Sequence, residues 1–178
     1  MHSRLFRLSL LLFISHTIAV VLNRTIDDGY GDPVTGKMPI YFPPSKPESP
    51  WNNQTCGGCA IQPNLNMTHR RTYTAATYHP FLQNMSITLD FTGIAVWVFF
   101  INANNAGIAV TTMTLANFTL DDQPPHLFQH VPDMTRTDND FDAVAYQQDG
   151  LTNTPHRLLI STTGDSDAYV NFDFAIYS

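Results

Sequence analysis

The feature that most constrains this chain is a strict alternation of apolar and polar residues in its second half. In residues 85–92, four apolar side chains, beginning with Met85, alternate with four polar ones. This is the pattern of a β-strand that buries one face. The next segment, 94–101, is apolar on both parities, which predicts a central strand covered on both faces. No segment has the three-and-four apolar spacing of an amphipathic helix.

Strand-like segments follow one another at intervals of about ten residues, separated by turn residues. They are 38–42, 85–92, 94–101, 110–120, 126–131, 141–147, 156–162 and 168–177. About eight short antiparallel strands at this spacing predict an all-β fold, and specifically a jelly-roll β-sandwich.

Three finer expectations follow from the same pattern. The alternation in 168–177 predicts that the strand buries Val170, Phe172, Phe174 and Ile176 and exposes Asn171 and Asp173. Trp97, inside the apolar segment 94–101, is expected in the core. In the segment 110–120, the alternation of apolar and polar residues shifts by one position near 115–116, which predicts a β-bulge there.

The stretch from residue 20 to about residue 70 is expected to be irregular. Seven of the 12 prolines fall between Pro33 and Pro63, and a proline has no N–H to donate to a β-ladder. This stretch can therefore hold only short edge strands, of which 38–42 is a candidate. A chain of 178 residues is of single-domain size, so we expect one β-sandwich domain over 20–178.

Residues 1–19 have the features of a signal peptide. Arg4 and Arg7 precede a short apolar run at 8–15, and small residues at 17–19 offer a cleavage site. A retained anchor is the alternative, although the run is shorter than the ~20 residues of a spanning helix. No second apolar run follows, so we expect no membrane span after cleavage. The expected location is extracellular, either secreted or held at the cell wall or surface.

Five N-glycosylation sequons support export of the chain. Their asparagines are Asn23, Asn53, Asn66, Asn84 and Asn117. Because a glycan cannot be buried, all five are expected at the surface.

Charge argues against a nucleic-acid partner. The net charge is −6, whereas binding to a phosphate backbone needs clustered lysine and arginine. The basic residues after the leader are scattered, and Arg70 and Arg71 are the one adjacent pair. The expected partners are instead an extracellular glycan or a cell-surface protein.

The two cysteines form the motif Cys56-Gly-Gly-Cys59. A redox site would need this motif at the start of a helix, and its flanks have no helical pattern. Zinc would need two more ligands, and none is evident at a matching spacing. In an exported chain, the motif predicts a structural disulfide that closes a small loop.

Three sets of side chains have some metal-binding character. The aspartates Asp27, Asp28 and Asp173 could converge on a structural calcium, because the first and last strands of a jelly roll are often neighbours; solvated acids are the alternative. Residues 138–142 resemble the start of a calcium loop but lack its later glycine and glutamate. The pair His126 and His130 lacks a third ligand. We expect no cofactor, with structural calcium left open.

Catalytic motifs are absent from the sequence. There is no nucleophile elbow, zinc-protease helix or phosphate loop. Glu48 is the one glutamate, whereas a glycosidase needs two placed carboxylates. The chain is therefore not expected to be an enzyme.

Three aromatic residues lie in or beside irregular segments and are candidate ligand contacts. They are Tyr41, Trp51 and Tyr78. An exposed ring can stack on the face of a sugar, and packing within the core or a loop is the alternative.

In their order along the chain, these pieces resemble the galactose-binding-domain-like β-sandwich of fungal secreted and single-pass surface proteins. The matching pieces are residues 24–28, Tyr41, Trp51 beside the cysteine motif, 77–78, 87–100, 118–121, 150–151, 156–161 and 172–174. The resemblance covers residues 23–177. It implies a β-sandwich that often binds carbohydrate. Family members often continue into a stalk and a membrane helix, so this chain resembles the ectodomain alone.

The sequence thus predicts a secreted, non-catalytic binding module for cell-wall or surface carbohydrate. Sandwich-end loops that carry Asp27, Asp28, Trp51 and Tyr78 would form its site. One alternative is an extracellular structural or protein-interaction protein, and another is a polysaccharide hydrolase without a recognised motif.

Overall fold

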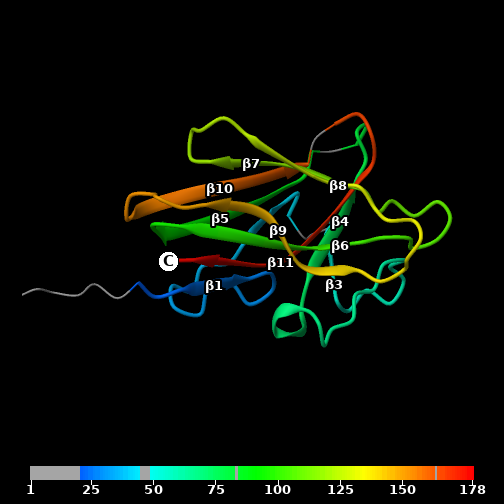
Figure 1. The fold of residues 1–178 in the computed structure, drawn as a ribbon, viewed down its shortest axis with the longest axis horizontal. Coiled ribbons are helices and arrows are strands. Elements are labelled where there is room, and N and C mark those ends of the chain that lie inside the picture. The colour runs from blue at the N-terminus through cyan, green and yellow to red at the C-terminus, as the bar shows by residue number, and fades with distance from the viewer. Residues whose placement is uncertain (1–20, 45–48, 83, 163) are drawn as a thin grey trace, which may run out of the picture.

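The protein is a sandwich of two antiparallel β-sheets (Figure 1). The computed structural model describes residues 21–44, 49–82, 84–162 and 164–178, so the predicted signal peptide, 1–19, lies outside it. The described residues form eleven strands and one short 3₁₀ helix, η1 (His69–Arg71). None of them forms a helix with the length and apolar character needed to cross a membrane. The predicted all-β sandwich is confirmed.

The first sheet has six strands, with β11 at its centre. Its hydrogen-bonded order is β3-β4-β11-β6-β9, and β1 pairs with β11 as well. The strands are β1 (Arg24–Asp27), β3 (Asn52–Asn53), β4 (Thr74–Tyr78), β6 (Val96–Asn102), β9 (Asp140–Gln148) and β11 (Ala168–Tyr177).

The second sheet has five strands in the order β2-β5-β10-β7-β8. They are β2 (Ile40–Phe42), β5 (Ser86–Gly93), β7 (Thr114–Leu120), β8 (His126–His130) and β10 (Thr154–Thr162). Eleven strands replace the eight that the sequence predicts, and the additional ones are β1, β3 and β4. β1 and β3 are only four and two residues long, and β4 is buried at nearly every position. None of the three therefore shows an alternating pattern.

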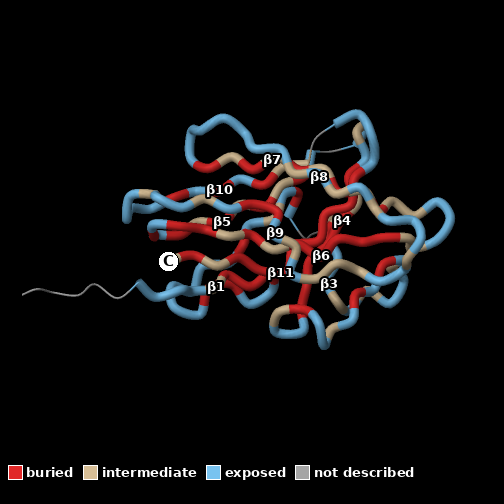
Figure 2. Tube along the Cα trace, viewed as in Figure 1, coloured by how far each residue is buried: buried red, intermediate tan, exposed pale blue. Residues whose placement is uncertain are grey.

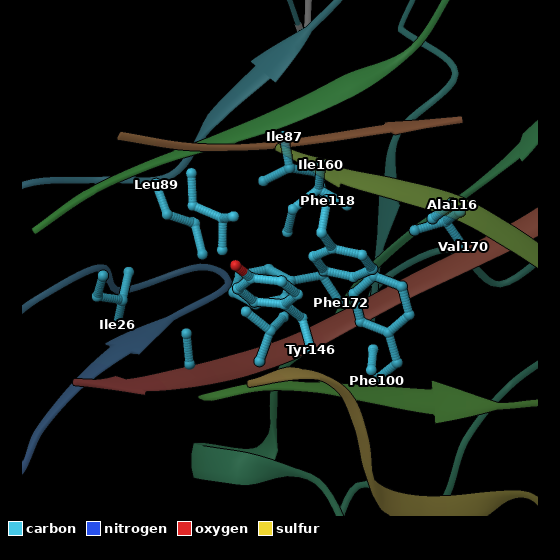
Figure 3. Close-up of a cluster of buried hydrophobic side chains, with 14 of the residues drawn as sticks. Ile26, Ile87, Leu89, Phe100, Ala116, Phe118, Tyr146, Ile160, Val170 and Phe172 are labelled. Carbon is cyan, nitrogen blue, oxygen red and sulfur yellow. The ribbon is translucent and has the colours of Figure 1, made fainter. Parts of the chain in front are cut away.

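The main core fills the space between the two sheets (Figure 3). β5 alternates as the sequence predicts, and its residues Ile87 and Leu89 are fully buried. From β7 of the same sheet, the ring of Phe118 stacks on the ring of Tyr146, which belongs to β9 of the facing sheet, at a centroid distance of 5.2 Å. It also meets the ring of Phe100 at 5.7 Å. Burial of these rings supplies much of the hydrophobic stabilisation.

A second, smaller apolar cluster covers the outer face of the six-stranded sheet. Its buried members are Ile61, Tyr73, Ala75, Ile101, Ala103 and Tyr169. Ile61 and Tyr73 belong to the connection between β3 and β4, so part of the stretch expected to be irregular packs over the sheet. In Figure 2, β4, β6 and β11 are accordingly buried along much of their length, while the outer loops are exposed.

Val170, Phe172 and Phe174 are buried as predicted, and Ile176 is half-buried. The regular alternation expected for 168–177 is wrong in its second half, because β11 contains a bulge. The register of β11 against β6 shifts between Phe172 and Phe174, which makes Asp173 an extra residue. One extra residue reverses the parity of the side chains that follow it. Phe174 therefore faces away from the main core and stacks on Phe99, with ring centroids 4.5 Å apart.

The polar residues of β11 are not exposed either. Asn171 and Asp173 are only 1% and 0% exposed. Their side of the sheet is covered by the outer apolar cluster and by η1, so both faces of β11 are buried.

Two further local expectations are wrong. Trp97 is half-buried and lines a small surface hollow with Gln147 and Asp149. β7 pairs with both of its neighbours without a register shift, so no bulge occurs at 115–116. The bulges of this fold lie in the pairings of β6 with β11 and with β9.

The turn between β1 and β2 depends on Gly31. This residue exchanges two backbone hydrogen bonds with Asp27, of 3.0 and 3.1 Å, and has a φ of +66°. A Cβ atom at position 31 would overlap the carbonyl oxygen of Lys37 and the sulfur of Met38. Gly36, in the same turn, also has a positive φ of +73°, but the space around it is open.

We predict that Gly31→Ala destabilises the protein far more than Gly36→Ala. The Gly36 variant incurs only the left-handed backbone penalty of about 1 kcal/mol. The Gly31 variant adds an overlap with backbone atoms, for a total of about 3 kcal/mol. Urea unfolding of the two variants measures the difference, and equal midpoints would contradict this account of the turn.

Candidate functional site

The site is built where two strands meet end to end along one edge of β11. β4 pairs with residues 168–172 of β11, β1 pairs with residues 174–177, and β6 occupies the opposite edge. The bulge residue Asp173 lies at the junction between β1 and β4. The junction therefore brings the end of β1, the start of β4 and the bulge into one place.

Three buried aspartates gather at this junction. Asp27, Asp28 and Asp173 are 1%, 1% and 0% exposed. The backbone N–H of Asp28 donates to the carbonyl oxygen of Asp173 at 3.1 Å. The sequence left two interpretations of these residues open, and the solvated one is wrong. We call the three residues the aspartate cluster.

Each carboxylate of the aspartate cluster accepts hydrogen bonds from the surrounding chain. Asp173 accepts from the backbone N–H of His69, at 2.9 and 3.2 Å to its two oxygens. Asp27 accepts from the N–H groups of Gly29 and Tyr30 at 3.0 and 2.6 Å. Asp28 accepts at Oδ2 from the hydroxyl of Thr74 at 2.7 Å, whereas its Oδ1 is buried without a hydrogen-bond partner.

Burial changes the acidity of two of these groups. Desolvation raises the pKa of Asp28 to about 6, against the effect of the hydrogen bond from Thr74. Desolvation also raises the pKa of Asp173 to about 7, with a further contribution from the negative charges of Asp28 and Asp142. Both carboxyls therefore titrate near neutral pH, which is a feature of functional sites.

Asp28 also lines a groove that opens to the surface. The groove has a volume of about 420 Å³ and lies where the edge strands β2 and β3 of the two sheets approach each other. Its lining residues are Asp28, Gly29, Met38, Pro39, Tyr41, Trp51, Asn52, Asn53, Thr55, Cys56 and Thr74. We call it the Asp28 groove. Three residues that the sequence predicts as ligand contacts, Asp28, Tyr41 and Trp51, meet there.

The two aromatic residues form the structural wall of the Asp28 groove. Trp51 is 8% exposed and donates from Nε1 to the carbonyl oxygen of Phe42 at 3.1 Å. Tyr41 donates its hydroxyl to the carbonyl oxygen of Asp28 at 2.9 Å, and the two rings are 5.1 Å apart. Both rings are held by hydrogen bonds and offer only part of their surface to a ligand.

The remaining predicted ligand contacts lie outside the groove lining. Tyr78 is 6% exposed and belongs to the main core. Asp27 does not line the groove, and its carboxylate accepts hydrogen bonds from the backbone N–H groups of the turn that follows it. Sequence reasoning missed Met38, Asn52 and Thr55, which line the groove. Asp27 and Asp28 drew attention as an acidic pair, but no pattern in the sequence marks these three residues.

The predicted disulfide is confirmed. Cys56 and Cys59 are bonded with an S–S distance of 2.05 Å, and a turn lies between them. Cys56 lines the Asp28 groove, so the small disulfide ring braces the end of β3 that forms one wall.

The asparagines of the five sequons are all accessible to some extent. Asn23, Asn53, Asn66 and Asn84 are exposed, and Asn117, on the outward face of β7, is half-buried. This placement matches the prediction that they lie at the surface. Their glycosylation stays a prediction.

The described residues offer little to a metal ion. Within 21–44, 49–82, 84–162 and 164–178, no three His, Cys, Asp or Glu side chains are grouped as ligands. Calcium takes six to eight oxygens, whereas the aspartate cluster leaves one carboxylate oxygen, Oδ1 of Asp28, without a partner. A structural calcium at Asp28 and Asp173 stays a prediction that this geometry does not favour.

The other two sets of candidate ligands have partners within the protein. Arg136 lies within 3.6 Å of Asp133, pairs with Asp138 at 2.9 Å and also pairs with Asp140. One arginine therefore offsets part of the negative charge of the acidic loop before β9. A ring nitrogen of His130 contacts the carbonyl oxygen of Ala103 at 3.1 Å, and His126 is exposed.

Comparison with known proteins finds only distant similarity. No protein-family model and no curated protein matches the chain. Three similar solved structures are of an exo-β-1,3-galactanase from Phanerochaete chrysosporium. One, with β-1,3-galactotriose, has 11% identity over 90% of this chain and 30% of that chain, with a TM-score of 0.46. Another with the same sugar has 15% identity over 62% and 24%, with a TM-score of 0.37.

The third, with galactose, has 12% identity over 60% of this chain and 32% of that chain, with a TM-score of 0.34. The chain spans about a third or less of the length of these structures. At such identities and TM-scores the similarity assigns no function, which must be inferred from the residues of this chain.

We predict that the protein becomes less stable as the pH rises from 5 to 7.5. Between the unfolded pKa near 4 and the folded values of about 6 and 7, the native state holds more protons on Asp28 and Asp173 than the unfolded state does. The free energy of unfolding therefore falls with rising pH, by about 2 kcal/mol or more. Urea titrations at several pH values measure it.

The control for this prediction is Asp173→Asn, which removes one of the two titrating groups and keeps an acceptor for the N–H of His69. Its stability should depend less steeply on pH than that of the wild type. A wild-type stability that is flat or rises between pH 5 and 7.5 would show that these carboxyls titrate normally.

Proposed function

We propose that this protein is a non-catalytic extracellular binding module that takes carbohydrate in the Asp28 groove. The observation that carries this proposal is Asp28, a residue of the groove lining whose buried Oδ1 atom has no hydrogen-bond partner. A buried acceptor of this kind costs free energy until it receives a hydrogen bond. A hydroxyl group of a bound ligand would supply that bond.

The rest of the Asp28 groove suits the two-sided chemistry of a sugar. Its apolar surface comes from Met38, Pro39 and the accessible part of Trp51, and would contact the C–H face of a ring. Its polar surface includes the side chains of Asn52 and Thr55, which can exchange hydrogen bonds with hydroxyl groups. A volume of about 420 Å³ lies within the range of small-ligand sites.

The carboxylates of the site support binding rather than hydrolysis. Glycosidases use two carboxyl groups that flank the bond to be cleaved. Among the described residues that line the Asp28 groove, Asp28 is the one carboxylate. Asp173 faces the N–H of His69 instead.

A protein partner is the second candidate, and the surface of β2 favours it. Ile40 and Phe42, on this edge strand, are 56% and 48% exposed. Exposed apolar residues on a sheet edge are a common feature of protein contacts. This surface lies next to Tyr41, whose hydroxyl reaches the backbone of Asp28.

The test is binding of the secreted full-length protein to a panel of glycans and insoluble polysaccharides. We predict saturable binding to one class, weakened about tenfold or more by Asp28→Asn, because a hydrogen bond to a charged acceptor is lost. This variant keeps the size of the side chain and removes a buried charge, so it should fold normally. Binding should also weaken below pH 6, as Asp28 becomes protonated.

Met38→Ala tests the apolar wall, with Met134→Ala as its control. The two methionines are 50% and 55% exposed, but only Met38 lines the groove. We expect Met38→Ala to weaken binding about three- to tenfold and Met134→Ala to leave it unchanged. No saturable binding across the panel would overturn the proposal, and concentration-dependent assembly in light scattering would then favour a protein-interaction role.

A further inference from the structure

The geometry points to Asn53 as a modification site whose own N-glycan lies in the Asp28 groove. The inference rests on the export predicted from the sequence and on the affinity for sugar proposed above for this groove. It adds a regulation of the same site, because a sugar attached at Asn53 competes with any external ligand.

Asn53 stands at the mouth of the groove. It is the last residue of β3, an edge strand that pairs with β4 alone. Its side chain is exposed, and it lines the Asp28 groove together with Met38 and Trp51. A group attached to this side chain therefore starts at the rim of the groove.

The local turn orients the side-chain amide of Asn53. Its Oδ1 accepts hydrogen bonds from the backbone N–H and the hydroxyl of Thr55, at 3.0 and 2.8 Å. These bonds hold the oxygen inside the turn and leave Nδ2, the atom that carries an N-glycan, outside it. The N–H of Cys56 bonds to the carbonyl oxygen of Asn53 at 3.0 Å, and the disulfide ring follows directly. The attachment point is therefore rigid.

The other four sequons are placed differently. Asn23 precedes β1, Asn66 precedes η1, Asn84 precedes β5, and Asn117 lies on β7 of the other sheet. None of these four asparagines lines the Asp28 groove. They therefore serve as controls for a general effect of glycosylation on the protein.

The first sugars of an N-glycan match the chemistry of the groove. An N-acetylglucosamine has an apolar ring face and an acetyl methyl group, which suit Met38 and Pro39. It also has hydroxyl groups that can donate to the unpaired Oδ1 of Asp28. A short covalent tether gives an effective concentration in the millimolar range, so even a weak intrinsic affinity fills the site.

The experiment uses the full chain secreted from a eukaryotic host, with glycopeptide mass spectrometry to read the occupancy of each sequon. Asn53→Gln is compared with Asn84→Gln, which removes a glycan from a sequon outside the groove. We expect Asn53→Gln to speed hydrogen exchange in residues 38–41 and 51–55 and to strengthen binding of the external glycan about tenfold. Asn84→Gln should do neither.

A second pair of variants controls for damage to the turn. Thr55→Ala abolishes the sequon, and Thr55→Ser preserves both the sequon and the hydroxyl that bonds Asn53. We expect the alanine variant to speed hydrogen exchange in the groove as Asn53→Gln does, and the serine variant to exchange like the wild type. External binding is not compared for the alanine variant, because it also removes a hydroxyl from the groove lining.

Two results would overturn the inference. One is an Asn53 that stays unmodified while other sequons carry glycan, and the other is a modified Asn53 whose removal changes neither exchange in the groove nor external binding. The proposed function fails separately. Removal of the Asn53 glycan could speed exchange in the groove while no variant binds any external glycan. That result would support the inference about the Asn53 glycan and overturn the proposal of an external carbohydrate ligand.

Discussion

The backbone pairing of β11 is the constraint on which the rest of the structure depends. This one strand holds β6 along one edge and both β4 and β1, end to end, along the other. The extra residue Asp173 lies where β4 ends and β1 begins. A bulge unpairs the ladder locally and turns side chains to new directions. In this protein, the bulge lies at the junction of β1 and β4, where the three side chains of the aspartate cluster are buried.

The aspartate cluster conflicts with the stability of the fold at neutral pH. Desolvation of a carboxylate is unfavourable, and the raised pKa values of Asp28 and Asp173 express that cost. Hydrogen bonds from Thr74 and from the N–H of His69 offset part of it. Proteins retain such conflicts mainly where function requires them, and the one carboxylate with an oxygen left without a partner belongs to Asp28, a residue that lines the groove.

The regular half of the fold could be predicted from sequence, and the site could be predicted only in part. β5 buries every second residue, so its alternation assigns Ile87 and Leu89 to the core, together with Met85 just before the strand. The bulge at Asp173 could not be predicted. Both faces of β11 are covered, so an inserted residue does not produce a visible change in the pattern of apolar and polar residues. The covering segments themselves are irregular, and their packing over β11 depends on tertiary contacts that no local pattern encodes.

The site combines residues from the regular strands with residues from the irregular, proline-rich segment. Thr74, at the start of the inner strand β4, lines the groove from the sheet, whereas Met38, Trp51 and Asn53 come from the proline-rich segment whose short strands lie at the edges of both sheets. Edge strands have room beside them for a ligand, and central strands do not. Asp28 belongs to both parts, since its backbone bonds to β11 and its side chain reaches the groove. A sugar hydroxyl bound at Oδ1 would therefore relieve a cost that the fold itself imposes, and binding would be coupled to the stability of the β1–β11 junction.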